Sequence, residues 1–288
     1  MYDTLTQRVV AGVDGWPGSR AAVELAAGEA ALRRMPLVLV ATGATPAKAG
    51  TRRQDPVLAE AVRHACTGWP GLAVAAIAAR GEPARSLIRE SCGAALVVVG
   101  PPAGAQPHCP VCAEVATHAW CPTLVVPPAA RGPVEGPVLL GLTMSEPDDP
   151  TIAFAFEEAS LRGARLIAVH VWSTVPGTAL HGINPFAYNL YQARSAADRL
   201  VADALVEWSQ KFPEVDVERM PLYDGDPAQT LLDASARAGL VVVGAAARTG
   251  SPLLGPVPRT MIQQAACPVA VVRRSGPCSC WDEELDPE

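Results

Sequence analysis

Short apolar runs separated by stretches of helix length recur along the first half of the chain. The runs are continuous rather than alternating, as is typical of parallel strands that are buried on both faces of a sheet. They lie near residues 8–13, 36–41, 72–78, 95–99 and 123–127. Strands that alternate with helices over short links favour a doubly wound α/β sandwich with a parallel, five-stranded sheet.

Aspartate–proline pairs and glycines mark the expected helix boundaries. An aspartate before proline supplies a capping oxygen and then a residue without an N–H group, at a helical position where that group has no partner. Such pairs occur at Asp55-Pro56, Asp149-Pro150 and Asp226-Pro227, and Gly93 and Gly239 lie where helices are expected to end. These signals place helices between the apolar runs.

Four motifs of the first half recur in the second half, and the repeat predicts two tandem copies of one fold. The pairs are Val9–Gly12 with Val138–Gly141, Gly81–Ala84 with Gly225–Ala228, Val97–Gly100 with Val241–Gly244, and Cys121-Pro122 with Cys267-Pro268. We expect domains over residues 1–130 and 137–274, joined by a linker rich in proline and glycine. The second copy has a longer predicted helix, at about 185–212. The acidic tail, residues 275–288, is expected to be disordered.

Charge and composition argue against several classes of function. The 23 Lys and Arg residues against 29 Asp and Glu residues give a net charge of −6, whereas nucleic-acid binding requires a basic face. No long apolar segment precedes Asp14, and four prolines interrupt the uncharged stretch at 91–113. We therefore expect neither a signal peptide nor a membrane span. Eight cysteines in such a chain indicate a reducing cytoplasm and mostly free thiols.

The loop after the first strand is the first candidate site, because ligands of open α/β sheets bind beyond the carboxyl ends of the strands. Asp14 ends the strand and Gly15 follows it. The carboxylate of Asp14 is placed to accept from a ribose hydroxyl or an adenine amine. The alternative is that Asp14 only starts a turn and that Ser19 caps the next helix.

Taken together, the motifs resemble the universal stress protein family over residues 8–128 and 137–273. They comprise Val9 to Gly15 with Gly18-Ser19, the Gly-x-Pro-Ala turns, the Val-Val-Val-Gly strands and Cys267 to Val272. The resemblance implies a sandwich of the adenine nucleotide alpha hydrolase type in each half, and a cytoplasmic, non-enzymatic protein of the stress response. It also implies that the last strands, at 123–127 and 269–273, pair the halves as an intramolecular pseudo-dimer, with a homodimer as a further option.

Members of this family frequently bind ATP through a Gly-x2-Gly-x9-Gly-Ser/Thr loop after the fourth strand. Glycines there let backbone N–H groups approach the phosphates, and the N-terminus of the next helix favours their charge. In the second half, Gly244 matches the first glycine and Gly255 the last, but Ala247 replaces the second glycine. Pro256 replaces the hydroxyl residue and Thr143 replaces the aspartate of the first strand.

The first half keeps the other end of such a site. Asp14 and Gly100 fit the family pattern, but Cys109 occupies the position of the last glycine. We therefore expect degenerate nucleotide sites in both halves, with ATP binding left open. The candidate contact residues are Gly12, Val13, Asp14, Gly15, Gly100, Gly244, Arg248, Ser251 and Gly255.

A C-x-x-C pair, Cys109 and Cys112, is expected to open the fourth helix of the first half. A helix N-terminus lowers the pKa of a thiol, so a reactive pair is one interpretation. Two free thiols without a function are the second. The third is a zinc site completed by His108 and by two cysteines of the tail, Cys278 and Cys280. The other four cysteines are expected in the core: Cys66, Cys92, Cys121 and Cys267.

Other polar and aromatic residues receive structural interpretations. Glu157 and Glu158 are expected on a solvated helix face, and His170 and Trp172 are expected to pack at the mouth of a pocket. Three functions remain open from the sequence. They are a regulatory stress protein, a thiol redox or zinc-responsive protein, and an ATP-binding switch with weak hydrolysis.

Overall fold

The computed structural model describes residues 7–15, 17–42, 56–101, 109–130, 135–142, 149–172, 185–245 and 253–273, and the counts given for the structure cover these residues. The first half contains β1 (Val9–Val13), α1 (Pro17–Arg33), β2 (Leu37–Thr42), α2 (Pro56–Gly68), β3 (Val74–Ala79), α3 (Pro83–Glu90), β4 (Leu96–Val99), α4 (Pro110–His118) and β5 (Thr123–Val125). The second half contains β6 (Val138–Leu142), α5 (Asp149–Arg162), β7 (Leu166–Trp172), α6 (Pro185–Lys211), β8 (Val217–Tyr223), α7 (Pro227–Ser235), β9 (Leu240–Gly244), α8 (Pro256–Gln264) and β10 (Val269–Val272). The five strands predicted in the first half are each present within two residues.

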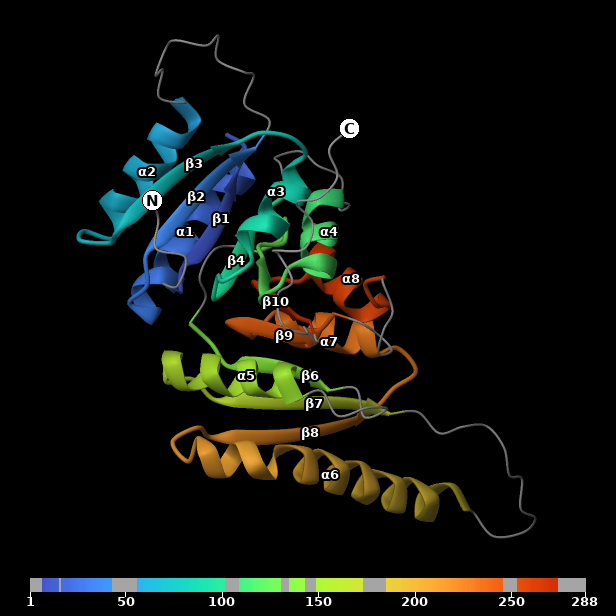
Figure 1. Cartoon of the computed structure of the whole chain (residues 1–288). Coiled ribbons are helices and arrows are strands. Elements are labelled where there is room, and N and C mark those ends of the chain that lie inside the picture. The colour runs from blue at the N-terminus through green and yellow to red at the C-terminus, as the bar shows by residue number, and fades with distance from the viewer. Residues whose placement is uncertain are drawn as a thin grey trace, which may run out of the picture.

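Both halves have the same strand order around a parallel sheet. The order is β3-β2-β1-β4-β5 in the first half and β8-β7-β6-β9-β10 in the second. Each strand pair within a half is parallel, which confirms the predicted α/β class. β5 and β10 then pair antiparallel, with Leu124 opposite Ala270, so the described strands form one ten-stranded sheet (Figure 1).

The helices cover both faces of this sheet because its central strands are apolar on both faces. Buried residues of α1, α2, α5 and α6 share one core with the strands, and those of α3, α4, α7 and α8 share the other. Side chains such as Val97, Val98 and Val241 are fully buried. This double cover explains why the strands are continuous apolar runs rather than alternating ones.

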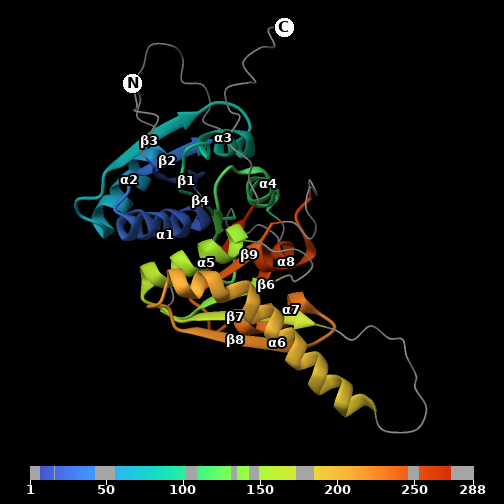
Figure 2. The same cartoon turned by 60° about the horizontal axis from the view of Figure 1, so that its bottom comes forward.

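The two halves are also joined by a buried cluster of charges beside the β5–β10 pair. Glu29 and Arg33 of α1 face Glu158 and Arg162 of α5, and each arginine pairs with both glutamates. Figure 2 shows α1 and α5 side by side at this position. Glu158 is only 1% exposed, so the prediction that it lies on a solvated face is wrong. Glu157 is exposed, as predicted.

Candidate functional site

The carboxyl end of the first-half sheet brings Asp14 near the start of α4. Asp14 follows β1 and is exposed, and Gly15 has a φ of +80°, a left-handed conformation that favours glycine. Gly100 follows β4 directly. Hydrogen bonding with Cys112 lowers the pKa of the Cys109 thiol, and the charge of Asp14 opposes this shift weakly. Residues that lie 95 positions apart in the chain therefore share one electrostatic environment.

The first turn of α4 is organised around the sulfur of Cys109. Cys109 is the N-cap, and its Sγ accepts the backbone N–H of Cys112 at 3.3 Å. The N–H of Val111 also stabilises the thiolate form. Pro110, which lies between Cys109 and Val111, has no N–H group. The donors of this first turn are thus directed at a sulfur atom.

These contacts separate the two thiols of the pair chemically. Hydrogen bonds from the Cys112 thiol and from the backbone lower the pKa of Cys109 to about 7, although partial burial and Asp14 oppose the shift. The same interaction and near-complete burial raise the pKa of Cys112 well above its usual value. Cys112 is 2% exposed, whereas Cys109 is half-buried. One thiol ionises near neutral pH and its neighbour stays protonated.

The corresponding end of the second half holds a cavity of about 220 Å³. It is lined by the ends of β6, β7 and β9 and by the first residues of α7 and α8, with Gly244 and Gly255 among the lining residues. His170 enters this lining, and its Nδ1 lies 3.2 Å from the carbonyl oxygen of Leu142. Because a carbonyl only accepts, that ring nitrogen carries the proton.

The start of α8 offers few backbone donors to this cavity. Gly255 is the N-cap, and its N–H already donates to the carbonyl oxygen of Ala245 at 2.9 Å. Pro256 and Pro258 have no N–H groups. Among the described residues of this first turn, only Val257 has a backbone N–H group that donates to no acceptor within the protein.

Comparisons with known proteins identify the relatives of this chain. Residues 136–273 match the model of the universal stress protein family. Universal stress protein Rv2005c of Mycobacterium tuberculosis is 34% identical over 292 aligned residues, which cover 93% of this chain and 97% of the relative. Universal stress protein Rv2623 of the same species is 31% identical over 296 aligned residues, which cover 93% of this chain and 96% of the relative. The chain belongs to the universal stress protein family.

A solved structure agrees with the fold of this universal stress protein. The crystal structure of a universal stress protein from Archaeoglobus fulgidus aligns with a TM-score of 0.62 at 17% identity. The alignment covers 95% of this chain and 99% of that structure. The similarity therefore extends over both halves.

The described candidate contact residues of the first half and Gly244 lie in or next to β1, β4 and β9, whereas Gly255 is the N-cap of α8, and two of these residues have packing roles. Val13 is 4% exposed and belongs to the apolar core. Gly12 leaves room for α3, because a Cβ there would come within 3.0 Å of Leu87 Cδ1. Arg248 and Ser251 lie outside the described residues. The same is true of Thr143, Ala247, His108, Cys278, Cys280 and residues 275–288, and of the Trp172 side chain.

Besides the expected exposure of Glu158, three sequence-based interpretations of this universal stress protein are wrong. α1 begins at Pro17, so Ser19 lies inside its first turn and is not the N-cap. Cys66 is exposed rather than buried. Cys92 is half-buried and disulfide-bonded, so it is not a free core thiol. Cys121 and Cys267 are buried, as expected.

The structure groups no three potential metal ligands together within its described part. Cys109 and Cys112 therefore form a pair there rather than part of a larger cluster. None of the described helices is both long enough and apolar enough to span a membrane.

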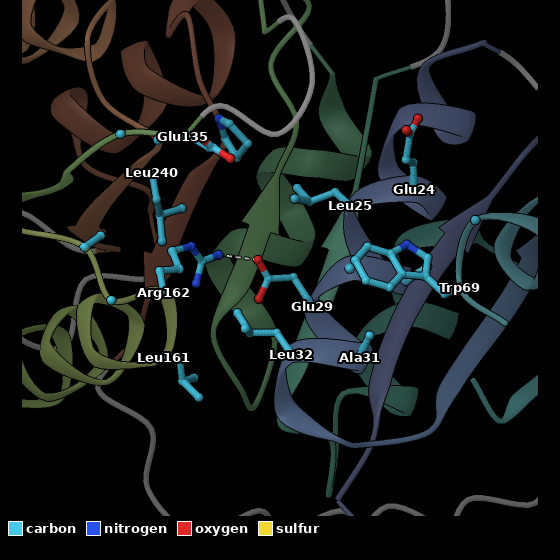
Figure 3. Close-up of a pocket in the computed structure, with 18 of the residues that line it drawn as sticks. Glu24, Leu25, Glu29, Ala31, Leu32, Trp69, Glu135, Leu161, Arg162 and Leu240 are labelled. Carbon is cyan, nitrogen blue, oxygen red and sulfur yellow. Dashed lines mark hydrogen bonds and ion pairs between the residues drawn. The ribbon is translucent and has the colours of Figure 1, made fainter. Parts of the chain in front are cut away.

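The structure also contains a larger groove that the sequence analysis did not anticipate. Its volume is about 1100 Å³, and it lies between α1, the end of α2 and the turn after α5 (Figure 3). Trp69 and Leu161 contribute apolar surface, and Glu29 reaches across to Arg162. One signal was available: the two Glu-x3-Arg pairs are offset by 129 residues, as are Val9 and Val138. The repeat thus places the two pairs at equivalent positions.

Proposed function

We propose that this universal stress protein is a non-enzymatic, cytoplasmic regulatory protein whose two halves form an intramolecular pseudo-dimer with degenerate nucleotide sites. The observation that carries the proposal is the state of the two helix N-termini that follow β4 and β9. Neither resembles an open phosphate cradle.

A phosphate group requires several converging N–H donors and the positive end of a helix. At α4, the donors of the first turn already face the sulfur of Cys109, whose thiolate form would repel a phosphate. At α8, two prolines remove donors and Gly255 donates within the protein. Only the nucleoside end of a site remains in the first half, at Asp14.

The pairing of the halves supports the pseudo-dimer. β5 and β10 join the two sheets by backbone hydrogen bonds, and the glutamates and arginines of α1 and α5 pair across the same boundary. Arg273 adds a third contact, since its guanidinium donates to the carbonyl oxygen of His118 at 3.1 Å. A protein built in this way completes its dimer within one chain, and any homodimer would use other surfaces.

The decisive test is the nucleotide content of the protein as purified. We expect a gently purified sample to release far less than one adenine nucleotide per chain after heat denaturation. Incubation with ATP is expected to yield no phosphate above the buffer control. Stoichiometric ATP in the released material would contradict the proposal, and steady phosphate release would contradict its non-enzymatic part.

A variant designed to restore donors at α8 provides a matched comparison. Pro256→Ser with Pro258→Ala returns two backbone N–H groups and one hydroxyl to the first turn. We expect its affinity for ATP to rise about tenfold over the wild type, the effect of a charge-assisted hydrogen bond. Glu157→Gln, an exposed change on α5, is the control. Tight ATP binding by the wild type in the same titration would argue against degenerate sites.

A further inference from the structure

We propose that Cys109 and Cys112 form a site of thiol–disulfide exchange whose substrates are low-molecular-weight disulfides. Cys109 is the attacking residue and Cys112 is the resolving residue. The proposal goes beyond the regulatory function above and does not depend on whether a nucleotide binds.

The geometry assigns the two roles. Cys109 is half-buried at the exposed start of α4 and lies at the carboxyl edge of the sheet. Cys112 lies one turn later and is 2% exposed, and its backbone N–H donates to the Cys109 Sγ at 3.3 Å. Each thiol also shifts the pKa of the other, which places the two side chains near one another. A reagent that enters from solvent can therefore reach Cys109 first, whereas the buried Cys112 is shielded from it.

The electrostatics favour the same assignment. With a pKa of about 7, Cys109 is roughly half thiolate at neutral pH, whereas an ordinary cysteine with a pKa near 8.5 is only a few per cent ionised. Thiols whose pKa lies near the ambient pH are the best attackers in exchange reactions. The raised pKa of Cys112 keeps it protonated, and it can act only after Cys109 has reacted.

The reaction balances without a cofactor. The Cys109 thiolate attacks one sulfur of the small disulfide, the S–S bond breaks, and one small thiolate leaves. Cys112 then gives its proton to that thiolate and attacks the Cys109 sulfur, which expels the second small thiolate. The products are a Cys109–Cys112 disulfide, one small thiol and one small thiolate. Two electrons pass from the protein thiols to the small disulfide.

The remaining free cysteines in the described part of the chain lack this combination of features. Burial raises the pKa of Cys121 and of Cys267 to about 12, so both stay protonated and shielded. Cys66 is exposed on α2, within its last turn rather than at its N-terminus. In the second half, Gly255 occupies the N-cap position that Cys109 occupies in the first. The site is therefore a property of the first half.

Glutathione disulfide is a suitable probe, applied to the full-length wild type at neutral pH and followed by peptide mapping after quenching with acid. We expect a disulfide between Cys109 and Cys112 as the main product, formed faster than any adduct on Cys66. Mapping also distinguishes this product from Cys92, which is already disulfide-bonded. Three results would overturn the proposal: free thiols at both positions, a stable glutathione adduct on Cys109 of the wild type, or faster modification of Cys66.

Two single variants test the order of events. Cys112→Ser is expected to accumulate one glutathione on Cys109, because the resolving thiol is absent. Cys109→Ser is expected to leave Cys112 unmodified, and Cys66→Ser should behave like the wild type. An adduct on Cys112 in the Cys109→Ser variant would reverse the roles and overturn the assignment. Should a variant fail to fold, the wild-type peptide map decides the proposal.

Discussion

The helices α4 and α8 occupy equivalent places in the two halves, yet their first turns differ in chemistry. Each follows the strand next to the central one and precedes the strand that joins the halves. In α4 the backbone donors are used by the sulfur of Cys109. In α8 two of the donors are absent, because prolines occupy those positions. Under the proposed function, the same helix terminus offers few donors to a phosphate in both halves, for two different reasons.

At the boundary between the halves, by contrast, the two copies have equivalent residues. Glu29 and Arg33 in α1 match Glu158 and Arg162 in α5 at the same 129-residue offset as the first strands. Each pair contacts its counterpart across the boundary. The two copies have thus diverged where a ligand would bind and have stayed alike where they contact each other.

The largest effect is expected from the buried charge cluster. Glu29→Gln or Glu158→Gln removes one buried negative charge and leaves Arg33 and the partly exposed Arg162 with a single partner carboxylate, which should lower the free energy of unfolding by about 3 kcal/mol. The two variants should lose similar amounts of stability, because each glutamate pairs with both arginines. Urea unfolding measures both. Glu157→Gln is the control and should change stability by less than about 0.5 kcal/mol. A loss below about 1 kcal/mol for either cluster variant would contradict this role.

The cluster also illustrates what the sequence could and could not predict. The fold followed from local information, because apolar runs, Asp-Pro helix starts and repeated motifs each determine structure nearby. The burial of Glu158 could not be predicted from local information, because a Glu-x3-Arg pair on a helix is equally typical of solvated surfaces. Its burial depends on α1 packing against α5, which is information that neither helix carries alone. The groove near Trp69 was missed for the same reason, since its walls come from both halves.

The candidate site was predictable where it depended on one segment of chain. The sequence placed Cys109 and Cys112 at a helix start, and Cys109 is indeed the N-cap of α4. The influence of Asp14 on Cys109 depends on how β1 and α4 meet in space. The spacing of the motifs can align Asp14 with a family pattern. It cannot show which thiol lies close enough to be affected by the charge of Asp14.

A second comparison concerns the glycines of the two central strands. A Cβ at Gly141 would lie 3.0 Å from Leu231 Cδ1 and 3.1 Å from Val243 Cγ1. At Gly12 the corresponding atoms are Leu87 Cδ1 at 3.0 Å and Val99 Cγ1 at 3.7 Å. Valine cannot move aside as leucine can, because its branched Cβ restricts rotation. We expect Gly141→Ala to cost about 2 kcal/mol and Gly12→Ala about 1 kcal/mol, as measured by thermal or urea unfolding. Equal costs would remove this distinction between the halves.

A smaller difference is expected at the starts of α3 and α7. Asp226 caps α7 by accepting from the N–H groups of Ala228 at 3.0 Å and Gln229 at 3.1 Å. The equivalent residue before α3, Glu82, forms no side-chain cap. Asp226→Ala should therefore cost about 1 kcal/mol. Glu82→Ala should stay within about 0.5 kcal/mol. A larger loss for Glu82→Ala in the same unfolding assay would show that the caps are not what distinguishes these helices.

The smallest effect is a pH dependence confined to α4. The folded state lowers the pKa of Cys109 to about 7, below the value near 8.5 expected for an unfolded cysteine. Folding therefore favours the thiolate, and the stability that it contributes grows as the pH rises from about 7 to about 8.5 and is lost as the pH falls through 7. Cys109→Ser should lack this increase.

The expected difference between wild type and Cys109→Ser is under about 1 kcal/mol, because Cys109 is only half-buried and solvent screens its charge. Urea unfolding of the reduced proteins across this pH range measures it. Cys121 and Cys267 do not interfere, since their raised pKa values of about 12 reduce stability only above the unfolded value. Gly255→Ala is the second-half control and should show no matching pH dependence, because α8 presents no titrating group at that position. If wild type and Cys109→Ser followed the same pH profile, the N–H groups of α4 would not be stabilising a thiolate, and the contrast between the two helix starts would rest on the prolines of α8 alone.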